Sequence, residues 1–160
     1  MKILGIDPGI ARCGWGVIEK IKNEKLKMKN CGCVETTAGL PVERRLRLIY
    51  EELTKIITTH KPDALAIEEL FFNTNSKTAF VVGQARGVIL LAAAEKNIPV
   101  AIYTPLQVKV AVTGYGRADK SQIGRMVKAI LKLKEIPKPD DVADALAVAL
   151  TCAFTSKFKK

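Results

Sequence analysis

Four acidic residues stand out because they lie where an ordinary fold has little use for a carboxylate. Asp7 ends the apolar stretch "KILGID", and Glu68 ends a second one, "DALAIE". Asp141 and Asp144 are three positions apart in "PDDVADALAVAL", so both face the same way at the start of a helix. A carboxylate at the end of a buried strand is costly to desolvate unless a cation neutralises it. The spacing therefore indicates a shared cation site.

Carboxylate oxygens are hard ligands, and they select Mg²⁺ or Mn²⁺. Two such ions, roughly 3.5–4 Å apart, could bridge a scissile phosphate, activate water and stabilise the leaving oxygen. Each acid also has a simpler interpretation. Asp7 could bond its own backbone in an Asp-Pro-Gly turn, Glu68 could merely end a strand, Asp141 could favour a helix start and Asp144 could form an ion pair. One cation site explains all four more economically.

The two strands that end in Asp7 and Glu68 must lie side by side for this site to form. We expect strands over residues 2–6 and 63–68. If they are adjacent and parallel, their carboxyl ends meet about 4.8 Å apart at one edge of the sheet. In open α/β sheets, ligands bind at this edge.

The remaining pattern predicts an α/β fold built on a mixed five-stranded sheet with helices on both faces. A strand over 14–20 is joined through the turn "KNE" (22–24) to a strand around Leu26 and Met28, where apolar residues alternate with lysines. A fifth strand covers 98–104. Parallel connections require helices on the faces of the sheet. The expected helices cover 41–59, 77–97, 105–114, 120–132, the last with Asp119 and Gln122 as a capping box, and a stretch from 140 onwards.

The helix over 77–97 is apolar on nearly every side, apart from Gln84 and Arg86. Such a helix needs cover on two sides. Its own sheet can supply one cover, and a second copy of the chain is the candidate for the other.

Composition narrows the class of protein. The 160 residues, 48% hydrophobic and 26% charged, fit one soluble domain over 1–160. A net charge of +10 favours a polyanionic partner, either nucleic acid or an anionic membrane surface. No targeting segment or uninterrupted apolar run of membrane-spanning length is present, and the four cysteines lack paired metal-ligand spacing. We therefore expect a cytoplasmic protein without a membrane anchor.

Five segments, "GIDPG", "AIEELFF", "GQARGV", "DKSQIGRMV" and "DDVADALAVA", resemble the RuvC-type Holliday-junction resolvases of the RNase H-like superfamily. The match runs in order from Lys2 to about Thr151. The resemblance implies an RNase H-like fold and a homodimer that makes paired, Mg²⁺-dependent nicks in opposing strands of four-way DNA junctions during recombination and repair. It also implies a partnership with a branch-migration helicase complex of the RuvA and RuvB type.

The resemblance further assigns the active site. Its acidic set matches the four carboxylates above, as both catalytic groups and metal ligands, and its active-site lysine matches Lys120, which would stabilise charge on the attacked phosphate. Without the resemblance, Lys120 would be an exposed lysine at a helix start. Glu69 is left out because strand alternation turns it to the opposite face, and Asp140 is expected at the helix N-cap, with a possible ligand role left open.

DNA contacts are assigned in the same way. Phe71 matches the residue that stacks on a base at the junction centre, whereas Phe72 is assigned to packing, the common role of such aromatics. Lys109 matches a lysine that contacts DNA. Flanking loops offer further backbone contacts, with solvated loop residues as the alternative: Asn73, Asn75, Ser76, Lys77, Tyr115 and Arg117.

Three other functions account for parts of this pattern. An ATP-using enzyme of the actin and sugar-kinase type needs a second lobe, for which 160 residues leave no room, and the chain has no G-x-x-x-x-G-K-[ST] loop. A non-catalytic junction-binding protein explains the basic charge but not four acids gathered opposite a polyanion. A different RNase H-like nuclease, acting on RNA or other branched DNA, would share the fold and the metal chemistry.

Overall fold

The computed structural model describes residues 1–21, 25–69 and 76–155, with the side chains of 76 and 77 excepted. Within this part, five strands and five helices follow one another in the expected order. They are β1 (Lys2–Asp7), β2 (Arg12–Lys20), β3 (Leu26–Glu35), α1 (Val42–His60), β4 (Ala64–Glu68), α2 (Ser76–Glu95), β5 (Val100–Tyr103), α3 (Pro105–Thr113), α4 (Lys120–Leu131) and α5 (Asp140–Thr155).

The strands form one mixed sheet in the order β3-β2-β1-β4-β5. β1 to β3 are antiparallel neighbours, while β4 runs parallel to both β1 and β5. This confirms the predicted five-stranded fold and the predicted pairing of the strands that end in Asp7 and Glu68. The pairing of β2 with β3 also confirms the hairpin, although its turn at 22–24 lies outside the described residues.

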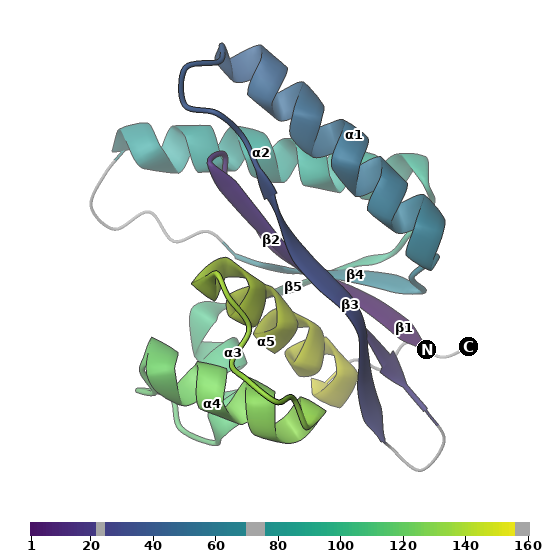
Figure 1. Ribbon diagram of the computed structural model, residues 1–160, viewed down its shortest axis with the longest axis vertical. Coiled ribbons are helices and arrows are strands. Elements are labelled where there is room, and N and C mark those ends of the chain that lie inside the picture. Colours follow the sequence, from purple (N-terminus) through teal and green to yellow (C-terminus); the bar gives the residue numbers. More distant parts are fainter. Residues whose placement is uncertain (22–24, 70–75, 156–160) are drawn as a thin grey trace.

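Helices cover both faces of the sheet, with α1 and α2 on one side and α3, α4 and α5 on the other (Figure 1). Side chains of the central strand alternate between the two resulting cores. Leu4 and Ile6 pack with α1 and α2, whereas Ile3 packs with α5. Because successive strand residues point to opposite faces, Asp7 faces the same side as Ile3. The sheet thus presents this acid to α5.

Helix α5 lies unusually close to the sheet because glycines face it. A Cβ at Gly5 would lie 2.1 Å from the carbonyl oxygen of Ala145, and a Cβ at Gly14 would lie 2.0 Å from that of Asp141. Any side chain at either position would push the helix away. The two glycines therefore set the height at which the acidic start of α5 sits above the carboxyl ends of β1 and β4.

Helix α2 has one face in the core and one face in solvent. Ala85, Ile89 and Ala92 are buried beneath it, whereas the side chains of Phe80 and Leu91 are 69% and 53% exposed. Residues Thr78–Glu95 have the length and a mean hydropathy, 1.3, that would also suit a membrane span. In this fold, however, the inner face of the helix packs on the sheet. The outer face is the part that lacks a cover among the described residues.

Candidate active site

The two strand-end acids are brought together by the register of the sheet. Ile6 pairs with Ile67 across the parallel β1 and β4 ladders, so Asp7 and Glu68 follow at the same level on neighbouring strands. Both side chains face α5, and both residues are half-buried. The sequence predicted this juxtaposition, and the parallel pairing provides it.

A hollow of about 440 Å³ lies where the carboxyl ends of these strands meet the start of α5. Asp7, Glu68 and Asp144 line it together. The predicted lysines Lys109 and Lys120 line it as well. Three of the four predicted acids and two basic side chains thus border one space, although they come from five different elements.

Asp141, the fourth predicted acid, stands at the margin of this site. It does not line the hollow, and its Oδ2 lies 3.6 Å from Nε of Arg12 in an ion pair. Its charge nevertheless contributes to the raised pKa of Asp7. Sequence reasoning missed Arg12. The available signal was the strand that begins with Arg12 and pairs with β1, which brings its first residues to the end of β1 that carries Asp7.

Lys120 is positioned by the cap of its helix. The Asp119 carboxylate accepts the backbone N–H of Gln122 at 2.8 Å, and the Gln122 side chain accepts that of Asp119 at 2.8 Å. This confirms the predicted capping box and starts α4 at Lys120 beside the hollow. There Nζ of Lys120 donates to Oδ2 of Asp144 at 3.2 Å. The charge of Asp144 raises the pKa of Lys120, which stays an ammonium.

Electrostatic repulsion among the acids is visible at Asp7. Burial raises its pKa to about 7, and the charges of Asp144, Asp141 and Glu68 push in the same direction, against a smaller effect of Lys120. Burial and then Asp144 also raise the pKa of Glu68, while Lys120 and Lys109 lower it. The hollow therefore holds more negative charge than its lysines neutralise. Added positive charge would favour the ionised acids.

The donor chemistry fits a hard divalent cation. The acids that border the hollow offer oxygen ligands only, and burial, followed by the charges of the neighbouring acids, raises the pKa values of Asp7 and Glu68. Within the described residues, no three His, Cys, Asp or Glu side chains are placed closely enough to hold one ion. Lys120 instead lies beside Asp144. Cation binding thus requires side-chain rotation at this site, with Asp7, Glu68 and Asp144 as the ligands nearest to hand.

Two expectations for neighbouring acids change. Glu69, which we placed on the opposite face, also lines the hollow. Glu69 follows the last residue of β4, and its N–H donates to the carbonyl of Tyr103 at 2.7 Å. Asp140 was expected as the N-cap of the last helix, but α5 already includes it as its first residue. It is exposed and does not line the hollow.

The predicted DNA contacts divide into two groups. Phe71, together with Phe72, Asn73 and Asn75, lies outside the described residues, as do the side chains of Ser76 and Lys77. Tyr115 and Arg117 are exposed on the loop between α3 and α4. Ala118 of this loop lines the hollow, but Tyr115 and Arg117 do not. Among the predicted contacts whose side chains the structure describes, Lys109 is the one that lines the hollow with the acids.

The mixed sheet, with acids at the ends of two neighbouring parallel strands and a further acid from a helix on one face, defines a metal-dependent nuclease of the RNase H-like class. The family model described as "Crossover junction endodeoxyribonuclease RuvC" matches residues 3–152. The chain therefore belongs to the RuvC family.

Relatives and solved structures agree along nearly the whole chain. Crossover junction endodeoxyribonuclease RuvC of Desulforamulus reducens is 59% identical over 150 residues, which are 94% of this chain and 91% of the relative. The structure of Thermus thermophilus RuvC superimposes with a TM-score of 0.88 at 41% identity, covering 96% of this chain and 94% of that one. The structure of RuvC from the same organism in complex with a Holliday junction substrate superimposes with a TM-score of 0.91 at 41% identity. This match covers 96% of this chain and 93% of that one.

Proposed function

We propose that this chain resolves four-way DNA junctions by nicking two opposing strands with one acidic site in each of two subunits. The observation that carries the proposal is the shared hollow of Asp7, Glu68 and Asp144, bordered by Lys120 and Lys109. Membership of the RuvC family supports the reaction, and the T. thermophilus complex with a Holliday junction supports the substrate. The net charge of +10 suits a polyanionic substrate.

Divalent cations held by Asp7, Glu68 and Asp144, with Asp141 at the margin, would supply Lewis-acid polarisation of the scissile phosphate and a nucleophilic water at neutral pH. We infer Mg²⁺, with Mn²⁺ as an alternative, and two ions per site. The residues themselves have separate tasks. Asp7 binds a cation in its ionised form, so it must first release the proton that its raised pKa lets it retain. The elements β1, β4 and α5 place these three carboxylates around one hollow.

The lysines act on the substrate. The ammonium of Lys120, once it leaves Asp144, can donate to an oxygen of the attacked phosphate and stabilise the charge that develops there. Lys109, across the hollow, can bind a phosphate of the same strand. Hydrolysis then breaks the bond between phosphorus and the 3′ oxygen, which leaves a 5′-phosphate and a 3′-hydroxyl.

A homodimer would bring two such sites to the two strands. The outer face of α2 supports this part of the proposal, because Phe80 and Leu91 are exposed there. A second subunit packed on α2 could cover these apolar side chains. A twofold dimer then matches the near-twofold symmetry of a four-way junction.

The cellular setting follows from the family. We infer that the whole of 1–160 works as one nuclease domain in the cytoplasm, during recombination and repair, without a membrane. A branch-migration helicase complex of the RuvA and RuvB type is the proposed source of its junctions.

Cleavage of end-labelled mobile and immobile four-way junctions, with and without Mg²⁺, tests the proposal. We expect symmetric, Mg²⁺-dependent nicks, and we expect Asp7→Asn and Glu68→Gln to slow cutting by about a hundredfold or more, since metal-assisted charge stabilisation contributes several kcal/mol. Glu43→Gln, an exposed acid on α1, is the matched control. Junction binding without cleavage would indicate a binding protein, and faster cutting of RNA hybrids or of other branched DNA would indicate a different nuclease of this class.

A further inference from the structure

We propose that a second hollow, next to the catalytic one, holds the base of a nucleotide close to the cut phosphate and so sets which DNA sequences are cut. The inference rests on the proposed junction cleavage. The hollow has a volume of about 230 Å³, and its lining residues are Thr113, Tyr115, Ala118, Gln122, Arg125 and Met126. A space of this size suits one ring system rather than a longer stretch of strand.

The two hollows are neighbours. Ala118 lines both of them, and the catalytic hollow continues along Asp119 and Lys120, where α4 starts. The second hollow is lined by the end of α3, by the loop 114–118 and by α4 as far as Arg125 and Met126. A strand whose phosphate lies against the acids therefore passes this loop within its next nucleotides. The base of one of these nucleotides can then enter the second hollow while the backbone of the strand stays on the protein surface.

The loop that carries Tyr115 is held in one conformation. Gly114 adopts φ +73°, which favours glycine, and its N–H donates to the carbonyl of Val110. The hydroxyl of Thr113 accepts the N–H of Tyr115 at 3.1 Å and lies 2.8 Å from the carbonyl oxygen of Lys109. The N–H of Ala118 donates to the carbonyl of Tyr115 at 3.2 Å. These bonds fix the backbone of Tyr115 from both sides.

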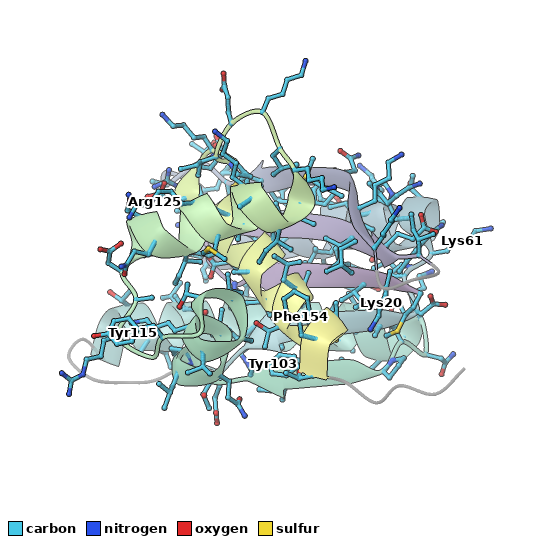
Figure 2. The ribbon with its side chains drawn as sticks, turned by 90° about the horizontal axis from the view of Figure 1, so that it is seen from below. Lys20, Lys61, Tyr103, Tyr115, Arg125 and Phe154 are labelled. Atoms are coloured by element: carbon cyan, nitrogen blue, oxygen red, sulfur yellow. The ribbon has the colours of Figure 1, made fainter. Side chains whose placement is uncertain are left out.

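The aromatic ring on this turn lies largely in solvent: Tyr115 is 55% exposed. A ring held out beside a nuclease site is suited to stack on a base, and every base offers a flat face for it. Met126, 37% exposed, supplies an apolar wall. Both Tyr115 and Arg125 lie towards the end of the molecule away from Phe154 and Lys20 (Figure 2). The hollow thus combines the stacking surface of Tyr115 with the apolar wall of Met126.

Arg125 supplies the polar group of the hollow. It is exposed and forms no ion pair among the described residues, so its guanidinium is available to a ligand. A guanidinium donates two parallel hydrogen bonds to the O6 and N7 acceptors of guanine. Gln122 is less available, because its side chain already accepts the N–H of Asp119. The hollow is therefore built for stacking on Tyr115 and for an acceptor-rich edge, which makes guanine the favoured base.

A set of junctions tests this inference. Each of three nucleotides on either side of the cut phosphate is replaced in turn by A, C, G, T or an abasic site, and single-turnover cleavage rates are measured. We expect wild type to favour guanine at one position by about 10-fold or more, and to lose that advantage with the abasic site. Tyr115→Ala should lower the rate on the preferred junction by about five- to 100-fold, the usual range for loss of a base–aromatic stack. Arg125→Lys should remove the preference for guanine over adenine.

The controls separate stacking from folding and from backbone binding. Phe154→Ala removes a similarly exposed ring that lines neither hollow, and Arg44→Lys makes the same charge-conserving change on α1. Both should cut like wild type, and all variants should keep the wild-type melting temperature. Equal losses for Tyr115→Ala on every junction, including the abasic one, would make Tyr115 a backbone contact and overturn the base-binding assignment. Uniform cutting of all sequences by wild type would overturn it too. Absence of any cleavage would instead refute the proposed function.

Discussion

The ammonium of Lys120 lies 3.2 Å from the carboxylate of Asp144, so the chain places one of its own cations at the acid where a metal ion is expected. The two residues are 24 positions apart and belong to different helices. Lys120 is largely exposed, with 75% of its side chain accessible, whereas the Asp144 side chain is 19% accessible. The lysine can therefore swing away while the acid stays. This pairing suggests an exchange in which an entering cation releases the ammonium towards the substrate phosphate.

Replacing Lys120 should separate cation binding from catalysis. We expect Lys120→Ala to lower kcat by about 10²–10³, the range for loss of one group that stabilises the developing charge. The Mg²⁺ concentration for half-maximal rate should fall, because Asp144 no longer has a competing ammonium. Mg²⁺ titrations of the single-turnover rate measure both effects, with Lys128→Ala in the last turn of the same helix as control. A higher Mg²⁺ requirement would show that Lys120 helps to arrange the ligands instead.

Cleavage should depend on pH through Asp7. Its pKa of about 7 means that much of this acid is protonated just below neutrality when no cation is bound. Since cations bind the ionised form, the rate at limiting Mg²⁺ should rise with pH through a midpoint of about 7 and level off above about pH 8. Saturating Mg²⁺ should move the midpoint to lower pH. Cleavage rates measured from pH 5.5 to 9 at two Mg²⁺ concentrations test this prediction. A midpoint of the pH–rate curve that is the same at both Mg²⁺ concentrations would contradict it.

Ionisation of Asp7 should lower the stability of the metal-free protein, although the same ionisation favours cation binding. Asp7 has a pKa of about 7 in the folded chain against an ordinary value of 3.8, so between these pH values the folded state keeps a proton that the unfolded state loses. The free energy of unfolding therefore falls as pH rises through this window, and the loss persists above it. Asp7→Asn should stabilise the protein at pH 8 by roughly 2–4 kcal/mol, and hardly at all at pH 4.

Denaturant titrations in EDTA at both pH values measure this difference. Glu135→Gln, which changes an exposed acid that does not line the hollow, gives the background effect of removing one charge. Added Mg²⁺ should stabilise wild type but not Asp7→Asn. Equal stabilisation at pH 4 and pH 8 would mean that the substitution acts through packing and not through the buried charge.

The outer face of α2 should hold the dimer together. Phe80→Glu and Leu91→Glu each place a charge on an apolar side chain that is more than half exposed in one subunit. We expect both variants to sediment as monomers of 17.5 kDa and to make single, unpaired nicks. Leu48→Glu changes a 38% exposed leucine on α1 and serves as the control. Variants that still sediment at twice this mass would place the dimer interface elsewhere.

The fold could be predicted largely from local pattern. Alternation and helical spacing gave all ten described elements to within a few residues, and the Asp119–Gln122 capping box lies where it was expected. Local pattern failed at chain positions where an element ends. Glu69 follows the last residue of β4, and no periodicity could tell that alternation stops there. Asp140 was expected as the N-cap but is the first residue of α5, because a helix start is defined only to within about a residue.

The candidate site was only half determined by sequence. Residue types and spacing identified the acids Asp7, Glu68, Asp141 and Asp144, because a carboxylate at a strand end or a helix start can be read from its neighbours along the chain. Their mutual arrangement could not be read, since it depends on contacts between distant segments. The pairing of Asp144 with Lys120 arises from how α5 meets α4, and the pairing of Asp141 with Arg12 from how α5 lies on β2. The hollow beside Tyr115 arises from how the end of α3 and its following loop meet α4. Periodicity specifies which face of an element is apolar. Close packing against glycines such as Gly5 and Gly14 decides how near two elements come, and so which charges meet.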